Sequence, residues 1–533
     1  MKTCGEVLVR ILESYGIDTI FGIPGVHTVE LYRGLADTGI RHVTPRHEQG
    51  AGFMADGYAR ASGRPAACFI ISGPGMTNIV TAMGQAYSDS IPMLVVSSVN
   101  RTDELSLGEG RLHELPDQRA LVSGVSVFSH SVLNVSELPA VLARAFAVFD
   151  SARPGPVHIE LPLDVITAPG DALDLAAHRG MNRPGPDPDA IARAAGLLRD
   201  AKAPFVVLGG GSIDAPDEAR ALVDTLGAPT ALTINAKGVL PGGHPLSLGS
   251  LLPLEPVMEA FKSADVVLAI GTELGETDTL LFDARLHLAG RLIRVDIEAE
   301  QLTRNALPEI GICSDAGLAM RALVGALVGF TPDFDKAREK VAALRRDALA
   351  GLRADYRLHH RFLDAVAAAL PGVVVAGDST QPVYGANFTY EPDGPRRYFT
   401  SSTGYGTLGY GLPAALGAKL ARPDLPVVAL IGDGALQFTI GELATAVELG
   451  LPVPILLWNN HGYGEIKQYM VERGIPTIGV DIYTPDFQAI ARGFGCHAVT
   501  VDSFEELRSA LREAVAADRP TVIEIDESRA FAD

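Results

Sequence analysis

Cysteine, tryptophan and positive charge are all scarce in this sequence. Its 533 residues include four cysteines and one tryptophan, and 44 Lys and Arg stand against 64 Asp and Glu. The cysteines, Cys4, Cys68, Cys313 and Cys496, lack metal-ligand spacing, so neither a zinc site nor a disulfide framework is predicted. The formal charge of −20 argues against nucleic acid or an anionic membrane as partner, because both need clustered Lys and Arg.

Long apolar runs are also missing. A run such as Val427 to Ile431 is far shorter than the roughly 20 residues that cross a bilayer. The first residues lead into an amphipathic helix pattern, without the apolar core and cleavage site of an export signal. We therefore expect a cytoplasmic protein with reduced thiols and no membrane partner.

Short apolar runs followed by Gly or polar residues and then a helical pattern recur along the whole chain, and the length suits roughly three domains. Alternating strands and helices predict an α/β fold of three tandem doubly wound parallel sheets. We expect domains at 1–175, 189–330 and 350–533, with the proline-rich segment 183–188 as a linker. The expected strands are 66–71, 93–96, 156–161, 205–208, 266–270, 292–297, 373–376, 427–431, 455–458 and 522–525.

Two polar residues follow neighbouring strands of the third domain. Asp433, within Gly432-Asp433-Gly434-Ala435, ends one strand, and Asn460 ends the next. The carboxyl edge of a parallel sheet is where ligands bind, and Mg²⁺ prefers oxygen ligands that it shares with a phosphate. The Asp433 carboxylate, the Asn460 amide oxygen and the Gly462 carbonyl therefore form a plausible half-shell. Gly-Asp-Gly alone is also a common strand-to-helix turn.

This pairing resembles the thiamine-diphosphate signature of the 2-oxo-acid decarboxylase and acetolactate synthase superfamily, and the resemblance covers nearly the whole chain. It implies that the first domain binds the cofactor's pyrimidine and the third its diphosphate, with a middle domain between them. The metal ligands it implies are Asp433, Asn460 and Gly462, and Gly432, Gly434 and Ala435 would approach the diphosphate through their backbone.

The segment from Arg46 to Arg60 is a second, independent match. The family gives the glutamate at the position of Glu48 the task of activating the aminopyrimidine ring, because a carboxylate at the ring nitrogen stabilises the tautomer that removes the thiazolium proton. Without the resemblance, Glu48 reads as a glutamate favoured at a helix N-terminus.

The segment from Thr400 to Ala415 is a third match. By resemblance, Leu408 is the wedge that bends the cofactor and the Gly406 carbonyl accepts its amine; a leucine between glycines is otherwise core packing. The strand-end residues Ser379, Thr380 and Gln381 would add diphosphate contacts.

A flavin, which some family members carry near the middle domain, suits this sequence poorly. The loop that follows the strand at 266–270 contains three acidic residues, Glu273, Glu276 and Asp278, and no arginine. The glycines of Gly209-Gly210-Gly211 are only a weak nucleotide signal.

Decarboxylases, carboligases and oxidases share these motifs, so the reaction depends on residues around the substrate tail. Acetolactate synthases carry a glutamine after the strand that corresponds to 93–96, whereas this chain has Ser97-Ser98-Val99-Asn100. The sequence looks most like 5-guanidino-2-oxopentanoate decarboxylases, particularly at 22–27 and 111–118. An acetolactate-synthase-like carboligase, an oxidase and a noncatalytic relative are the alternatives; intact Glu48, Asp433 and Asn460 argue against the last.

Three further residues are candidates for substrate chemistry. A buried Glu465 would favour a cationic tail, although a solvated glutamate at a helix start is an equal reading. His113 and His27 are candidates to protonate the product, because histidine titrates near neutral pH; either also serves as a structural hydrogen-bonding residue. The resemblance implies a small 2-oxo acid as substrate and a homodimer or homotetramer as the active assembly.

Overall fold

The computed structural model describes residues 2–529 and 531. The chain forms two compact units. The first runs to Asn182 and includes Tyr405–Asp502 and most of the segment after Glu513; the second comprises Arg183–Gly404 and Ser503–Arg512. Within the described part of the chain, no helix is both long and apolar enough to cross a membrane.

Three sheets organise the chain, and all their pairings are parallel, as the α/β prediction requires. Their strand orders are β2-β1-β3-β4-β6-β5, β11-β10-β9-β7-β8 and β13-β12-β14-β15-β17-β16. Central strands such as β3, β4, β14 and β15 are buried along their whole length, since helices cover both faces of a parallel sheet.

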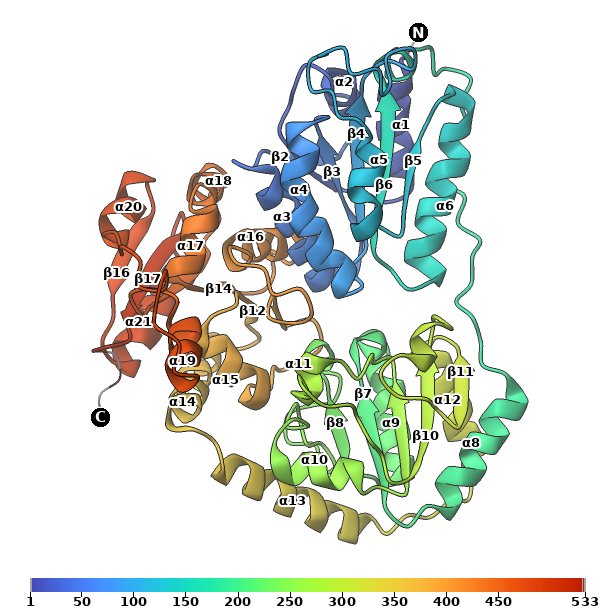
Figure 1. Ribbon diagram of the computed structural model, residues 1–533, viewed down its shortest axis with the longest axis vertical. Helices are drawn as coiled ribbons and strands as arrows, with labels where there is room; N and C mark the ends of the chain where they lie inside the picture. The colour runs from blue at the N-terminus through green and yellow to red at the C-terminus, as the bar shows by residue number, and fades with distance from the viewer. Residues whose placement is uncertain (1, 530, 532–533) are drawn as a thin grey trace. The chain divides into compact units, whose positions relative to one another are not determined.

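Figure 1 shows helices flanking the first sheet. The apolar faces of α1 and α6 pack on one side of this sheet, and α3 and α4 lie on the other. The strands of this sheet are β1 (Thr19–Gly22), β2 (Arg41–Val43), β3 (Ala66–Ile70), β4 (Met93–Val99), β5 (Phe128–Ser131) and β6 (Pro156–Pro162). The helices are α1 (Cys4–Ser14), α2 (Val29–Leu35), α3 (Glu48–Ser62), α4 (Pro74–Ser88), α5 (Gln118–Val122), α6 (Leu138–Ser151) and α7 (Leu163–Ile166).

The second sheet has one apolar cluster on each of its faces. Its strands are β7 (Pro204–Leu208), β8 (Thr230–Leu232), β9 (Val266–Ile270), β10 (Arg291–Asp296) and β11 (Ile310–Cys313). The helices here are α8 (Pro188–Asp200), α9 (Pro216–Leu226), α10 (Glu255–Lys262), α11 (Glu276–Thr279) and α12 (Ala316–Ala326). The predicted linker 183–188 leads directly into α8, which begins at Pro188.

The third sheet carries the strand ends singled out above. Its strands are β12 (Val374–Gly377), β13 (Tyr398–Thr400), β14 (Val427–Gly432), β15 (Pro454–Asn459), β16 (His497–Thr500) and β17 (Thr521–Asp526). The helices after Pro332 are α13 (Phe334–Ala350), α14 (Ala354–Ala369), α15 (Gln381–Thr389), α16 (Gly411–Ala421), α17 (Asp433–Thr439), α18 (Glu442–Glu448), α19 (Gly464–Glu472), α20 (Phe487–Gly493) and α21 (Phe504–Val515).

Candidate active site

Glu48 is the first residue of α3, and its side chain is half-buried. The Asn78 side-chain amide of α4 donates to Glu48 Oε2 at 2.9 Å. The Glu48 carboxylate therefore lies beside the start of α4 and the Ser72–Gly75 turn, where a Cβ on Gly75 would lie 3.4 Å from Glu48 Oε1. The N-terminus of α3 and the turn before α4 therefore meet at Glu48.

The small residues of α3 allow another helix to approach closely. A Cβ on Gly57 would lie 2.1 Å from the Ala414 carbonyl oxygen of α16, and a Cβ on Gly417 of α16 would lie 1.9 Å from the Met54 carbonyl oxygen. The two backbones are thus in direct contact, which only glycine permits at these positions.

Glu442 holds the chain just before α3, and sequence reasoning missed it. This buried side chain of α18 accepts the backbone N–H of Arg46 at 3.0 Å and that of His47 at 3.2 Å. Burial raises the pKa of Glu442, and the hydroxyl of Thr445 and the two backbone donors oppose that rise. An acid in the first turn of a short helix is the one local signal, and it does not reveal a partner so far away in sequence.

His27 and His113 come together on the Ser72–Gly75 turn. His27 Nδ1 lies 2.9 Å from Ser72 Oγ, and the two imidazole rings are 5.0 Å apart at 71°. His113 adopts a left-handed φ of 60°, and its Nδ1 is buried without a hydrogen-bond partner among the described residues. Burial and then the neighbouring His113 lower the pKa of His27, while Glu104 opposes this. The neutral form of His27 is therefore favoured.

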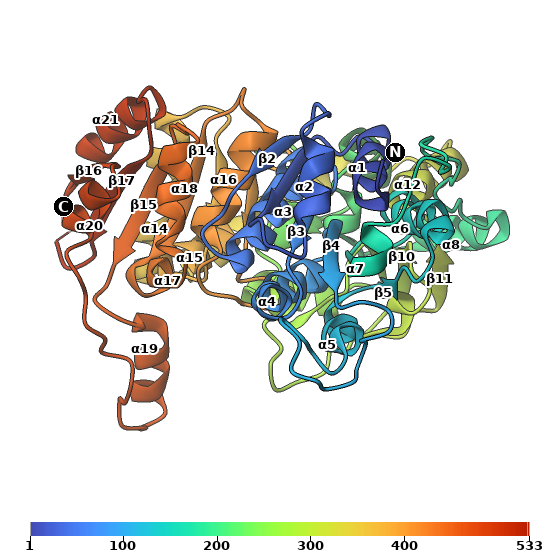
Figure 2. The same ribbon diagram turned by 90° about the horizontal axis from the view of Figure 1, so that it is seen from above.

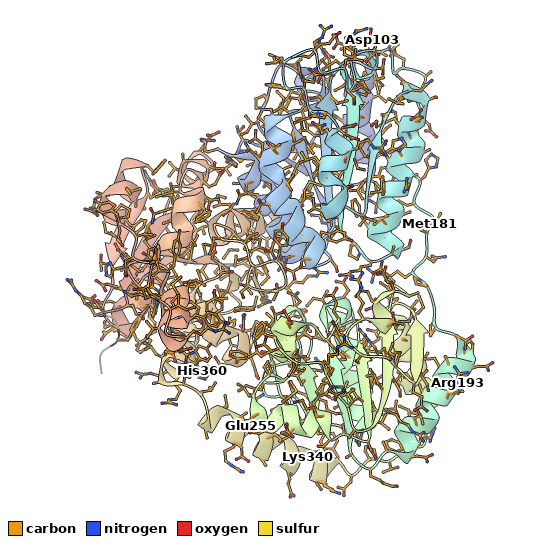
Figure 3. All side chains as sticks on the ribbon, in the orientation of Figure 1. Asp103, Met181, Arg193, Glu255, Lys340 and His360 are labelled. Carbon is orange, nitrogen blue, oxygen red and sulfur yellow. The ribbon has the colours of Figure 1, made fainter. Side chains whose placement is uncertain are left out.

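His113 belongs to the loop that joins β4 to α5. Asp103, labelled at the top of Figure 3, is part of the same loop. A β4-to-α5 loop leaves the carboxyl end of its strand, the edge where ligands bind in parallel sheets. The histidine pair therefore lies at the expected edge of the first sheet.

Asp433 lies at the end of β14 and is the first residue of α17, with its side chain buried. The backbone N–H groups of Gly434, Asn460 and Gly462 hydrogen-bond its carboxyl group and oppose the rise in pKa that burial causes. The adjacent strands β14 and β15 therefore bring these two segments together, as the strand pattern predicts. A buried carboxylate with a raised pKa gains stability from a nearby cation.

The backbone around this carboxylate is tightly constrained. Gly462 has a φ of +152°, and a Cβ there would lie 2.5 Å from the Val480 carbonyl oxygen. The Tyr463 ring packs against Gly434, where a Cβ would lie 2.7 Å from it. Carboxylate, amide and carbonyl oxygens on two such loops fit Mg²⁺, which binds hard oxygen ligands and shares them with phosphate.

The loop that carries Gly406 and Leu408 is tied to the first sheet's helices. The Thr407 hydroxyl donates to Gln85 Oε1 of α4 at 3.1 Å, and its backbone N–H donates to the same atom at 3.3 Å. Gly406 has a φ of +75°, with open space where a Cβ would stand, and Leu408 is half-buried. This geometry leaves the Gly406 backbone accessible to a ligand.

Ser379, Thr380 and Gln381 belong to the second compact unit, at the start of α15. Ser379 Oγ lies 3.2 Å from Ser401 Oγ, and the Ser379 N–H donates to the buried Asp378 at 2.9 Å. These residues form a polar turn at the carboxyl end of β12, which is a suitable position for diphosphate contacts.

Glu465 is half-buried in the first turn of α19. Helix α19 contains no buried residue, and Ile466, Tyr469 and Val471 are 52%, 51% and 63% exposed. Figure 2 shows α19 extending away from β15, the strand that precedes it in the chain. Glu465 therefore lies three residues beyond Gly462, at the base of a helix with an uncovered apolar face.

The glycines after β7 make a backbone contact within the second unit. Gly211 donates its N–H to the Gly271 carbonyl oxygen at 3.0 Å, and a Cβ on Gly209 would lie 2.2 Å from that oxygen. In the acidic loop that follows, Asp278 accepts the Ile234 N–H. Close backbone packing is thus one reason for the glycines at 209–211.

Three family models match this chain. The thiamine pyrophosphate enzyme N-terminal TPP-binding domain matches residues 2–121, the central domain matches 191–323 and the C-terminal TPP-binding domain matches 377–525. Glu48 lies in the first match, and Asp433, Asn460 and Gly462 lie in the third.

Known proteins resemble the chain over nearly its whole length. A probable 2-ketoarginine decarboxylase of Pseudomonas aeruginosa is 45% identical over 98% of this chain and 94% of its own. The acetolactate synthase isozyme 1 large subunit of Escherichia coli is 34% identical over 98% and 93%. A solved structure of a candidate thiamin diphosphate-dependent enzyme from Mycobacterium smegmatis has the same fold, with a TM-score of 0.83, 24% identity and 99% of each chain covered. The chain belongs to the thiamine pyrophosphate enzyme family.

Proposed function

We propose that this protein is a thiamine-diphosphate and Mg²⁺ dependent decarboxylase of a 2-oxo acid with a cationic tail, 5-guanidino-2-oxopentanoate, also called 2-ketoarginine. The observation that carries the proposal is the convergence of Glu48, His27 and His113 on the Ser72–Gly75 turn. This arrangement supplies a carboxylate to activate the cofactor and imidazoles to protonate the product. The similarity to a probable 2-ketoarginine decarboxylase supports the choice of substrate.

Two groups of residues would hold the cofactor. Asp433, Asn460 and the Gly462 carbonyl would bind Mg²⁺, and the backbone of Gly432, Gly434 and Ala435 would approach the diphosphate. Ser379, Thr380 and Gln381 are further candidates for diphosphate contacts, on the resemblance to the family alone. Glu48, the Gly406 carbonyl and Leu408 would hold the pyrimidine ring. Thiamine diphosphate, when bound, supplies the carbanion chemistry by which a 2-oxo acid loses carbon dioxide.

The side chains of His27, His113 and Glu48 are the proposed proton-transfer groups. Non-oxidative decarboxylation turns a 2-oxo acid anion and one proton into an aldehyde and carbon dioxide. His27 or His113 would deliver that proton to the carbon that has lost carbon dioxide, since both rings lie at the site and imidazole exchanges protons near neutral pH. The carboxyl group of Glu48 would share a proton with the pyrimidine ring nitrogen through a hydrogen bond.

Glu465 is the proposed contact for the guanidinium tail. A carboxylate and a guanidinium form a charge-assisted, two-pronged contact that a neutral side chain does not replace. We expect Glu465→Gln to lower kcat/KM for 5-guanidino-2-oxopentanoate by an amount that corresponds to about 1.5–3 kcal/mol of lost transition-state stabilisation. The change in kcat/KM for a neutral 2-oxo acid of similar length should be much smaller. Glu472→Gln, at the other end of α19, is the matched control.

The ratio of the two kcat/KM values is the measurement, because it cancels damage to the shared cofactor site. Equal losses on both substrates would place Glu465 outside the substrate pocket. A wild type that releases no carbon dioxide from the guanidino acid would refute the substrate assignment.

A carboligase is the second candidate, favoured by the similarity to an acetolactate synthase subunit. It differs in the fate of the carbon that loses carbon dioxide, which bonds to a second carbonyl instead of a proton. Product analysis with one and with two carbonyl substrates separates the two reactions: an aldehyde as sole product supports decarboxylation, and a hydroxy-oxo acid supports ligation.

A further inference from the structure

A buried polar network lies behind the Ser72–Gly75 turn. Gln118, the first residue of α5, is 3% exposed, and its side-chain amide lies between this turn and the strands β4 and β6. Its Oε1 accepts the Gly73 N–H at 3.1 Å. Its Nε2 lies 3.1 Å from Ser97 Oγ, 3.0 Å from the Ser98 carbonyl oxygen and 2.9 Å from Glu160 Oε2.

The acceptors determine which way this amide points. The Ser98 carbonyl and the Glu160 carboxylate only accept hydrogen bonds, so the NH₂ group must face them. The amide oxygen is then left to face the Gly73 N–H. A flipped amide would set an oxygen against two acceptors and an NH₂ group against a donor, so Glu160 fixes the orientation of Gln118.

Glu160 is itself held in place. The Ser131 hydroxyl of β5 donates to its other oxygen at 2.5 Å, and the side chain is 4% exposed. Burial raises its pKa, which the hydroxyl of Ser131, the amide of Gln118 and the charge of Arg119 oppose and Asp117 reinforces. His158 lies on the same strand, and its two ring nitrogens are hydrogen-bonded to the hydroxyls of Ser97 and Ser129. Burial, and to a lesser extent the positive charge of Arg119, lowers the pKa of His158 to about 3.

The turn needs such support because its backbone is unusual. Gly73 has a φ of +67° and ψ of −110°, and a Cβ there would lie 2.7 Å from the His113 carbonyl oxygen. His113 is also left-handed. The next residue back, Ser72, carries the hydroxyl that meets His27. A shift of Gly73 would therefore move the contacts of both histidines.

We propose that Gln118 is a positioning residue whose amide, oriented by Glu160, fixes the Ser72–Gly73 turn and with it the geometry of His27 and His113. It contacts the turn and not the reacting atoms. The inference rests on the proposed function for its activity readout, and on hydrogen exchange for a readout that needs no activity.

The first test replaces the side-chain amide of Gln118 with a carboxyl group. Gln118→Glu sets a second carboxylate beside Glu160. Because like charges repel, we expect this pair to hold one shared proton at low pH and to lose it as the pH rises. The protonated pair again has a donor for Glu160 and an acceptor for Gly73. At pH 8 we expect the kcat of this variant to be at least tenfold below that of the wild type, and its KM to stay within about threefold of the wild-type KM. The ratio of variant kcat to wild-type kcat should recover as the pH falls to 6.

The double variant Gln118→Glu/Glu160→Gln restores one amide and one carboxylate with their positions reversed. We expect it to recover part of the loss in kcat at pH 8, because the new amide donates to the new carboxylate, which still accepts the Gly73 N–H, while the Ser98 carbonyl loses its donor. Equal loss at every pH, together with no recovery in the double variant, would show that Gln118 only fills space.

The second test needs no substrate. Gln118→Leu removes the acceptor of the Gly73 N–H, so hydrogen exchange of this amide, followed by mass spectrometry of the peptide around 70–76, should accelerate at least tenfold. Glu160→Gln keeps the acceptor and should accelerate it much less. Unchanged exchange in a folded Gln118→Leu protein overturns the positioning role. A wild type inactive on every 2-oxo acid refutes the proposed function instead.

Discussion

Glu48 is the residue on whose side chain the proposed chemistry depends most directly. Its oxygen accepts a hydrogen bond from Asn78, so its orientation is set before any ligand binds. Glutamine has nearly the same shape but does not hold or release a proton. The substitution Glu48→Gln therefore removes the acid and preserves the packing.

We expect Glu48→Gln to leave folding and cofactor affinity broadly intact and to slow hydrogen–deuterium exchange at the thiazolium carbon by at least the 10²-fold typical of lost acid–base catalysis. NMR after acid quench measures this exchange. Glu505→Gln, an exposed acid in the first turn of α21, is the control. Exchange as fast as wild type would remove Glu48 from the mechanism.

At the scale of elements, the contact of α3 with α16 is the closest helix approach near the site. An alanine usually stabilises a helix relative to glycine, yet the Gly57 Cβ position is occupied by the Ala414 carbonyl oxygen. Gly196 offers the opposite environment, because it lies exposed in the middle of α8 with nothing within 4 Å of its Cβ position.

The two glycines should therefore respond in opposite directions. We expect Gly57→Ala to lower the free energy of unfolding by about 1–3 kcal/mol, as overpacking does, and Gly196→Ala to raise it by about 0.4–1 kcal/mol. Urea unfolding of both variants checks this. A stabilised Gly57→Ala would mean that the two helices lie farther apart.

Strands could be predicted from sequence where helices bury both of their faces. The apolar runs at 266–270 and 427–431 correspond closely to β9 and β14. The edge strands β2, β5 and β16 were missed, because exposed or half-buried residues such as those of His497–Thr500 form no apolar run. The buried inner strand β1 was missed as well, because Thr19–Gly22 offers only two strongly apolar residues. A search for apolar runs therefore finds the longer central strands and misses short strands and edges.

The same reasoning applies to the site. Asp433 and Asn460 each follow a buried run, so their meeting could be predicted from the rule for parallel strands. The bonds from Glu442 to Arg46 and from Gln118 to Glu160 join residues far apart in the chain. No local pattern marks such partners, since Glu442 and Gln118 look like ordinary polar residues at a helix start.

At the scale of the whole molecule, a buried lysine makes stability depend on pH. Lys237 Nζ lies 2.5 Å from Ser250 Oγ and 2.6 Å from the Tyr390 carbonyl oxygen, and burial lowers its pKa to about 7 against an ordinary 10.5. Between these values the unfolded chain binds one more proton than the folded chain. Raising the pH through this window therefore stabilises the folded protein.

We expect the free energy of unfolding of wild type, relative to Lys237→Met, to increase by about 2–3 kcal/mol between pH 7.5 and 9.5, since each unit contributes about 1.4 kcal/mol. Denaturant unfolding at several pH values gives the difference. Lys340→Met, which alters an exposed lysine of α13 labelled in Figure 3, is the control. A difference that does not change with pH would contradict the lowered pKa.

The proposed assembly can be tested with two inactive chains. If each site uses Glu48 of one copy and Asp433 of another, mixing Glu48→Gln with Asp433→Ala chains gives mixed dimers with one intact site. Random exchange of subunits should then restore up to about a quarter of wild-type activity. Either variant alone is the control, and no recovery after demonstrated exchange would indicate sites formed within one chain.

The exposed apolar side chains of α19 should affect the heat capacity of any association that covers this helix. Its apolar side chains, including Ile466 and Val471, are exposed in the single chain, and it follows directly on the proposed metal ligand Gly462. A ligand or second copy that covers this helix removes apolar surface from water, which lowers the heat capacity. The enthalpy of association would then become more favourable on warming, more steeply than the polar contacts of a diphosphate alone would produce.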